Sequence, residues 1–224
     1  MPVRTTYDAG AACWIDRISA EPAGAEAFYA ALLGWEYAEE GGYRTARSAG
    51  ELVAGFGTAP GRLEFWVVYL AAKDLDATAV RVVELGGTVV LAPVDAGDNG
   101  RLLLAADPAG TLVGFWQGRR ADGVVLADES GAACRYELHV PETAAVAGFY
   151  AGLGADPAIR LVADPSGPAH WLVHFGVDSL VGAVRTALAA GARVTGYDDG
   201  SVRLLDARGA RFALVATDVP ASAA

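Results

Sequence analysis

The chain has few cysteines, fewer basic than acidic side chains and no long hydrophobic run. These shortages limit the classes of function that the protein can have. Its 224 residues hold two cysteines, and 17 Lys and Arg stand against 27 Asp and Glu, so the formal net charge is −10. A surface that acidic repels phosphate backbones and anionic lipid, so we expect no nucleic-acid and no membrane partner. No apolar stretch approaches the roughly 20 residues of a membrane span. Residues 1–10 lack the apolar core of a signal peptide, which predicts a cytoplasmic protein.

Two common catalytic motifs are also missing. No glycine-rich phosphate loop followed by Lys-Ser or Lys-Thr occurs, and no Gly-x-Ser-x-Gly elbow occurs. These absences argue against nucleotide-dependent and serine-hydrolase chemistry. What the chain has in quantity is hydrophobic residues, 53% of the total, which is enough for a packed core.

The sequence repeats itself. Residues 11–30 resemble 132–151, residues 74–89 resemble 179–194, and residues 104–110 resemble 204–209, in the same order. The polar stretch 119–131 separates the copies. We therefore predict a first domain over residues 1–118, a linker over 119–131 and a second domain over 132–224.

Within each half a short strand, a helix and further short strands occur twice. Residues 25–33 place Phe28, Tyr29, Leu32 and Leu33 on one helical stripe, and Gly34 ends that helix. Residues 107–110 (Asp-Pro-Ala-Gly) predict a hairpin turn between the last two strands. The pattern predicts an α+β protein of four βαβββ modules, paired into two curved mixed sheets.

The first strand, the Phe-Tyr helix, the Leu-Gly stop and the Asp-Pro-x-Gly hairpin, in this order, resemble the vicinal oxygen chelate superfamily (glyoxalase, bleomycin resistance, extradiol dioxygenase). The match looks nearest to two-domain glyoxalase-like proteins of actinomycetes that are described as hydroxylases. The resemblance implies one cleft per domain, between paired modules. It leaves the activity open, because members include isomerases, ring-cleaving dioxygenases, thiol transferases and antibiotic-sequestering proteins.

Metal-dependent members of this superfamily carry His or Glu early in the first strands and Glu in the last strands. The corresponding positions here are Trp14, Val67, Arg135 and Leu172, with Gly114 and Ala213 in last strands. None of these side chains ligates a divalent cation. We therefore expect no metal and no other cofactor, which disfavours glyoxalase I and extradiol dioxygenase chemistry.

Strand alternation separates two faces of each sheet. Runs such as Trp66, Val68 and Leu70 predict an apolar face against the helices, and Cys13 and Cys134 are expected there as small buried residues. The opposite face of each sheet would line the cleft.

In the second half this opposite face carries Glu137, His139 and His174, which we interpret as catalytic acid/base groups, with Glu137 orienting a histidine. Two alternatives stay open. The three side chains are hydrogen-bonded groups lining a polar pocket, or they hold a non-haem iron or zinc ion at positions unlike those of the superfamily. His170, next to Pro168, is expected in a loop.

In the first half the opposite face carries Trp14, Asp16 and Tyr69, and with Trp116 these would form an aromatic-walled cleft for a flat ligand. The alternative is a filled pocket. Arg135 would anchor a ligand carboxylate or pair with Glu137. Further strand residues are expected at cleft rims: Tyr43, Arg47, Arg101 and Arg203.

Two functional hypotheses follow. The first is a metal-independent acid/base isomerase, cyclase or lyase of bacterial secondary metabolism that acts on a conjugated or carbonyl-bearing metabolite. The second is a protein that binds an antibiotic or pathway intermediate without turnover. Both predict a hydrophobic or aromatic small-molecule ligand. Because two module pairs are fused in one chain, we expect a monomer or a weak homodimer.

Overall fold

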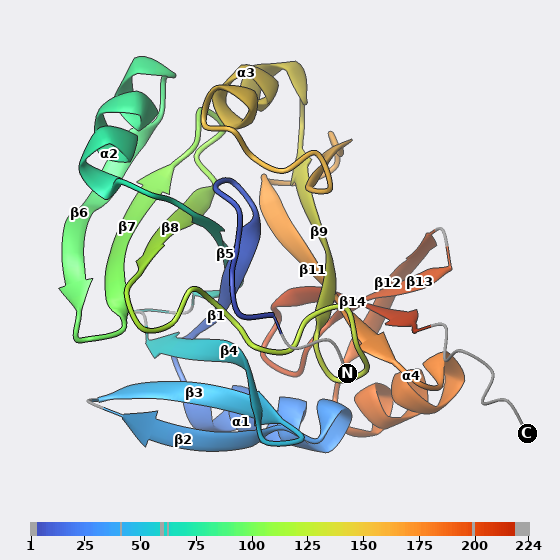
Figure 1. Ribbon diagram of the computed structural model, residues 1–224. Coiled ribbons are helices and arrows are strands. Elements are labelled where there is room, and N and C mark those ends of the chain that lie inside the picture. The colour runs from blue at the N-terminus through green and yellow to red at the C-terminus, as the bar shows by residue number, and fades with distance from the viewer. Residues whose placement is uncertain (1–3, 41, 59–60, 62, 199, 218–224) are drawn as a thin grey trace, which may run out of the picture.

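A computed structural model describes residues 4–40, 42–58, 61, 63–198 and 200–217. It confirms the α+β class, with two mixed sheets of eight and six strands and four helices (Figure 1). Within the described residues, no helix has the length and apolar character needed to cross a bilayer.

The first sheet contains the two modules of the first half. Its strand order is β2-β3-β4-β1-β5-β8-β7-β6, so the central pair β1 and β5 joins the modules in antiparallel fashion. The strands are β1 (Ala12–Ser19), β2 (Glu36–Glu40), β3 (Tyr43–Ser48), β4 (Glu51–Thr58), β5 (Glu64–Ala71), β6 (Thr88–Ala96), β7 (Gly100–Ala106) and β8 (Leu112–Gly118).

The second sheet repeats this plan with a shortened third module. Its order is β10-β9-β11-β14-β13-β12, and its two modules are again joined by an antiparallel first-strand pair, β9 and β11. The strands are β9 (Ala133–Val140), β10 (Arg160–Ala163), β11 (His170–Val177), β12 (Arg193–Asp198), β13 (Ser201–Leu205) and β14 (Arg211–Ala216). The third module has one strand after its helix where the repeat predicted three, so one flank of this sheet is open.

Each module contributes one helix. The helices are α1 (Pro22–Leu33), α2 (Leu75–Glu84), α3 (Ala144–Gly152) and α4 (Leu180–Ala189). Gly34 ends α1 in the left-handed conformation, at φ 69°, and donates its N–H to the Ala30 carbonyl, as the sequence predicted. Asp74 and Ser179 cap the N-termini of α2 and α4 through their side-chain oxygens.

A β-bulge moves each cysteine off its expected face. In β1, Ala12 pairs with Leu70 and Trp14 already pairs with Tyr69, so Cys13 is the extra residue. Cys13 packs with Tyr69 on the side away from the helices. Cys134 occupies the matching shift in β9. The predicted burial of Cys13 is confirmed, but its predicted contact with the helix-facing core is wrong.

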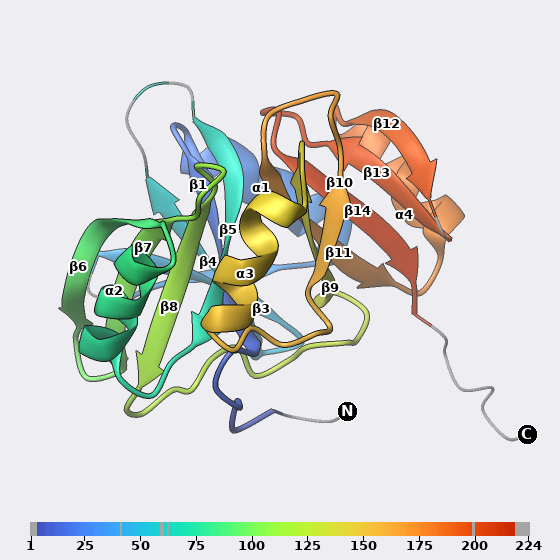
Figure 2. The ribbon, with the colours of Figure 1, turned by 90° about the horizontal axis from the view of Figure 1, so that it is seen from above.

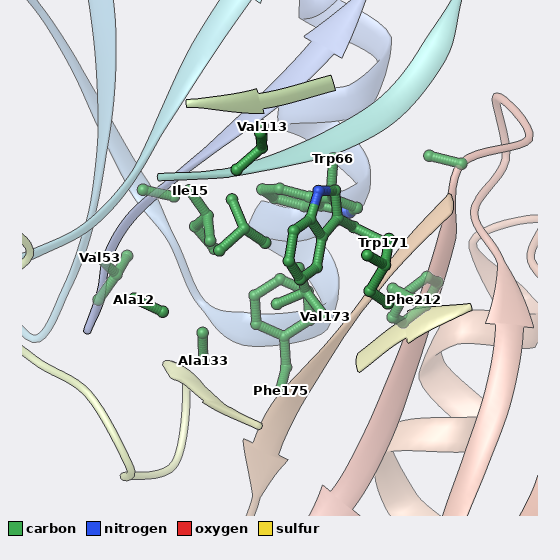
Figure 3. Packing of buried hydrophobic residues seen from close by; sticks show 14 of the residues in the cluster. Ala12, Ile15, Val53, Trp66, Val113, Ala133, Trp171, Val173, Phe175 and Phe212 are labelled. Carbon is green, nitrogen blue, oxygen red and sulfur yellow. The ribbon is translucent and has the colours of Figure 1, made fainter. Parts of the chain in front are cut away.

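One hydrophobic core lies between the two sheets and their helices (Figure 3). Trp66 of β5 and Phe175 of β11 have ring centroids 5.3 Å apart, and Tyr29 of α1 contacts both rings and Phe212 of β14. Helices α1 and α4 lie side by side against this core (Figure 2). The two halves share their interior, so the division into separate domains stays a prediction.

Two motifs that suggested the family are joined across the halves. The Tyr29 hydroxyl of α1 donates to Asp206 in the second half's last hairpin, at 3.1 Å. The Tyr150 hydroxyl of α3 donates to Asp107 in the first half's hairpin, at 3.0 Å. Each tyrosine of a Phe-Tyr helix therefore fixes the other half's turn. Only the first link includes a buried cation: Arg17 of β1 donates two hydrogen bonds to Asp206.

The predicted linker is packed against the first sheet. Val124 and Leu126 are buried, and the Val124 N–H donates to the Cys13 carbonyl at 2.8 Å. Tyr7 donates from its hydroxyl to the Val124 carbonyl. The linker and the segment before β1 thus cover the helix-free face of the first sheet.

Candidate active site

Rows of paired residues bring the candidate groups together on the helix-free face of the second sheet. His139 of β9 pairs with His170 of β11, and Glu137 pairs with Leu172. His174 pairs with Arg135 on one side and with Ala213 of β14 on the other. Directly paired residues point to the same face, so strand register alone sets this arrangement.

This face borders a cavity of about 360 Å³. His139 and His170 line it, whereas Glu137 and His174 do not. Its wall contains His139, Val162, Ala163, Asp164, Ser166, His170, Leu172, Thr195, Arg203, Leu204 and Arg211. A ligand in the cavity would therefore meet His139 directly and have Glu137 and His174 behind it.

Glu137 is the centre of a buried polar cluster. Its Oε2 lies 3.1 Å from His139 Nε2 and 3.4 Å from His174 Nε2, and its Oε1 lies 3.2 Å from Arg160 Nη1. All three members of the predicted triad are almost fully buried, with exposed fractions of 3%, 2% and 1% for Glu137, His139 and His174. The structure thus brings the three residues into contact. Their catalytic role stays a prediction.

The electrostatics favour an ionised Glu137. Burial raises the pKa of its carboxyl, but His139 and His174 outweigh burial and hold the pKa well below its usual range. In the neutral form of the His139 ring, an ionised carboxylate at Nε2 favours the tautomer with the proton on that nitrogen, which leaves the lone pair on Nδ1. Nδ1 lies 3.7 Å from the Asp164 carboxylate in the cavity wall.

His170 was expected in a loop, and that expectation is wrong. It is the first residue of β11, and its ring stacks on His139 with centroids 5.0 Å apart. The Pro168 carbonyl lies 2.9 Å from its Nδ1, which assigns the proton to that nitrogen. Burial lowers the pKa of His170 to about 4, so the ring is neutral at pH 7. Pairing with β9 decided its place.

The first half fills the corresponding space with its own side chains. Asp16 and Tyr69 hold the places of Glu137 and His174, and the Tyr69 hydroxyl donates to Asp16 Oδ2 at 2.8 Å. Trp14 Nε1 and the Tyr43 hydroxyl both donate to Asp16 Oδ1.

Glycines make room for this filling. A Cβ atom at Gly55 would overlap the Tyr43 hydroxyl and the Asp16 carboxylate. The aromatic-walled cleft predicted from Trp14, Asp16 and Tyr69 is therefore a filled pocket, the alternative named above.

Trp116 and Arg135 adjoin these clusters: Trp116 packs against the apolar group of Cys13, Val67 and Tyr69, and Arg135 is the strand partner of His174. Trp116 lines a hollow of about 240 Å³ beside Tyr7 and Lys73, and its Nε1 donates to the Ala121 carbonyl. Arg135 is partly buried beside His174 and lines neither cavity. The cation beside Glu137 is Arg160, so the suggested pairing of Arg135 with Glu137 does not occur.

The superfamily's metal positions do not fit a metal in either half. In the first half the Tyr69 ring lies over Gly114, where a Cβ atom would come within 2.1 Å of the ring. In the second half the last-strand residue beside His174 is Ala213, which has no ligand atom.

A different set could hold a cation. His139, Asp164 and His170 have ligand atoms within 4.8 Å of one another. The superfamily positions and this set are separate, since His139 and His170 pair nearer the other end of the face.

Three cavity residues were missed or underweighted. Asp164 was not predicted from the sequence; it starts an Asp-Pro-Ser-Gly segment, a composition that favours a turn. Arg203 was noted only as a rim residue, and Arg211 was not noted. The usable signal was alternation in β14, where Arg211 and Ala213 share a face.

Comparison with known proteins fits this architecture. A family model described as a glyoxalase-like domain matches residues 12–115. CFP32 of Mycobacterium tuberculosis, whose name assigns it to the glyoxylases, is 31% identical over 87% of each chain. The anthracycline biosynthesis protein DnrV of Streptomyces peucetius is 30% identical over 94% of each chain.

Among solved structures, the Mn(II)-bound glyoxalase of Novosphingobium aromaticivorans superposes with a TM-score of 0.67 at 18% identity. That match covers 94% of this chain and 85% of the other. A homoprotocatechuate 2,3-dioxygenase of Arthrobacter globiformis gives 0.66 at 14% identity, over 96% and 83%. These two matches show the fold alone. The chain belongs to the glyoxalase-like, vicinal oxygen chelate superfamily, and its relatives include proteins named for anthracycline biosynthesis.

Proposed function

We propose that this protein is an acid/base enzyme of bacterial secondary metabolism that acts on a conjugated or carbonyl-bearing metabolite without the superfamily's metal. One observation carries the proposal: a buried carboxylate–imidazole pair, Glu137–His139, stands at the wall of an open cavity. A carboxylate on one imidazole nitrogen orients the ring and stabilises its charged form, which makes the other nitrogen a competent base. The relatives named for anthracycline biosynthesis support a secondary-metabolite setting.

His139 is the catalytic residue of this proposal. Its Nδ1 removes a proton from the carbon next to a carbonyl group, and the electron pair of that C–H bond moves to the carbonyl oxygen to form an enolate. Return of the proton at another atom completes an isomerisation. Attack of the enolate carbon on a second carbonyl carbon of the same ligand breaks that C=O π bond, and the resulting alkoxide takes the proton back from His139, which gives a cyclisation. Expulsion of a leaving group from the β-carbon, with the proton of His139 passing to that group, gives an elimination. Glu137 holds Nε2 protonated, and His174 acts as a positioning residue on the far side of Glu137.

The proton transfer is tested with 1-phenylpropan-2-one, a neutral ketone. The wild-type protein should accelerate exchange of its benzylic protons in D₂O, followed by ¹H NMR. His139→Ala should lose about 100-fold or more of that rate, and Glu137→Gln a smaller part, since general-base catalysis contributes about 10²–10⁴-fold. Arg101→Gln is the control, because Arg101 pairs with Asp76 in the first half. Exchange that is no faster than with free imidazole, or that survives His139→Ala, contradicts the proposal.

Binding without turnover is the second candidate, and the hollow beside Trp116 and Tyr7 favours it. Aromatic walls suit a flat ligand by stacking. If sequestration is the function, Trp116→Ala weakens ligand binding and no product forms with any ligand. If acid/base chemistry is the function, Trp116→Ala leaves the proton exchange of the ketone unchanged.

A further inference from the structure

The cavity of the second half carries more positive than negative charge, in a protein whose net charge is −10. Its wall contains two guanidinium groups, Arg203 and Arg211, and one carboxylate, Asp164. Glu137 lies outside the wall and already has Arg160 and His139 as neighbours. A local positive region on an acidic protein attracts anions to that place and to few others.

Neither wall arginine has a partner within the described part of the chain. No ion pair or hydrogen bond joins the side chain of Arg203 or Arg211 to another described residue. The Nε atom of Arg203 is buried without an acceptor. A buried donor without an acceptor is destabilising, and buried polar groups in proteins are as a rule hydrogen-bonded. Arg203 as a whole is partly buried and Arg211 is exposed, whereas the fully buried Arg17 is saturated by Asp206, Glu64 and the Ile18 carbonyl.

The sheet holds these two groups beside the proposed base. Arg203 of β13 pairs with Ala213, which pairs with His174, so a small side chain separates the arginine from the cluster. Its guanidinium lies against Gly196 of β12, where a Cβ atom would come within 2.9 Å of Nη2. Phe212 pairs with Val173, which places Arg211 next to Leu172 on the cavity side.

We propose that the cavity recognises a carboxylate on its ligand through Arg203 and Arg211, next to His139, so that the substrate class is an anionic carbonyl compound. This inference rests on the proposed function, because it assigns the substrate class of the same site. A guanidinium presents parallel N–H groups that match both oxygens of a carboxylate. The same charges oppose a divalent cation between His139, Asp164 and His170.

The experiment compares two isosteric probes, 2-naphthoate and its neutral amide 2-naphthamide, by isothermal titration calorimetry with the whole protein. Naphthoate should bind at least about tenfold more tightly than naphthamide, because a guanidinium forms stronger hydrogen bonds with a charged acceptor than with a neutral amide. Arg203→Gln and Arg211→Gln should each remove most of this preference and leave naphthamide binding unchanged. The control Arg101→Gln should change neither affinity.

Equal affinities for the two probes, no naphthoate binding in the millimolar range, or an unchanged preference in Arg203→Gln would overturn the inference. So would naphthoate binding that appears only after Mn²⁺ or Zn²⁺ is added and disappears in Asp164→Asn, because a metal would then hold the anion. The two proposals fail separately: His139→Ala should retain the naphthoate preference while losing proton exchange from the neutral ketone.

Discussion

Both halves bring the same two strand positions into contact, but the residues there fill a pocket in the first half and lie behind an open cavity in the second. In the first half Asp16 meets Tyr69, and two further donors occupy the remaining space. In the second half Glu137 meets His174 and His139, with an open cavity beyond. Burial raises the pKa of Asp16, whereas the two histidines lower that of Glu137 despite its burial. Identical strand register therefore yields a filled pocket or a reactive one, depending on the neighbours.

The two tyrosine–aspartate links between the halves also differ in the neighbours of their carboxylates. Asp206 accepts from Tyr29 and from the buried cation Arg17. Asp107 accepts from Tyr150 but pairs with no cation among the described residues, since the residue matching Arg17 in β9 is Leu138. Burial accordingly raises the pKa of Asp107. One link is an ion network and the other a single charge-assisted hydrogen bond, so each half stabilises the other to a different degree.

The largest expected effect comes from breaking the ion network. Arg17→Met should lower the free energy of unfolding by about 3–5 kcal/mol, because Asp206 would remain buried without a cation and Glu64 would keep only Arg208, at 3.7 Å. Urea unfolding monitored by circular dichroism measures this loss of stability. Tyr150→Phe in the other link should cost only about 1 kcal/mol. Equal losses in the two variants would contradict the asymmetry of the links.

A smaller effect separates the two pockets. Asp16→Ala should cost about 2 kcal/mol of stability, since it removes the acceptor of Trp14, Tyr43 and Tyr69, and it should leave proton exchange in the second half unchanged. Glu137→Gln should change stability less and lower exchange instead. Unfolding curves and exchange rates on the same preparations measure both. If Asp16→Ala lowers the exchange rate as far as Glu137→Gln does, the two pockets do not act separately.

The smallest effect is a pH dependence from His170, whose folded-state pKa of about 4 lies below the ordinary 6.5. Between these values the unfolded chain binds the extra proton, so stability falls as the pH falls from 6.5 towards 4. The contribution should be about 1 kcal/mol, because water reaches part of the ring and screens the charge. His170→Gln should flatten this part of the profile, measured by urea unfolding at pH 7 and pH 4.5. If the dependence of stability on pH is the same in His170→Gln, the ring of His170 is solvated in the folded protein.

Local sequence patterns predicted the recurring elements well. Helix stripes, Gly34 and the Asp107 turn depend on backbone preferences of neighbouring residues, and the structure confirms them. The third module was wrong in detail, because the residues after α3 carry no alternation that distinguishes one strand from three. The cysteines were predicted on the wrong face because a bulge adds one residue to the strand. Simple alternation of side chains does not reveal such an extra residue.

The sequence by itself determined the repeat, the α+β class, the family and the loss of the superfamily's metal ligands, since each depends on residue types at short spacing. Only the tertiary structure decided which pocket is open. Gly55 and Gly114 admit Tyr43 and Tyr69 into the first pocket across strands that are far apart in the chain. Asp164 reaches the second cavity from the third module, after β10, and Arg203 and Arg211 reach it from β13 and β14 of the fourth. Strand pairing brings together side chains that are far apart in the sequence, and no local sequence pattern marks them. Their contacts therefore become known only from the folded sheets.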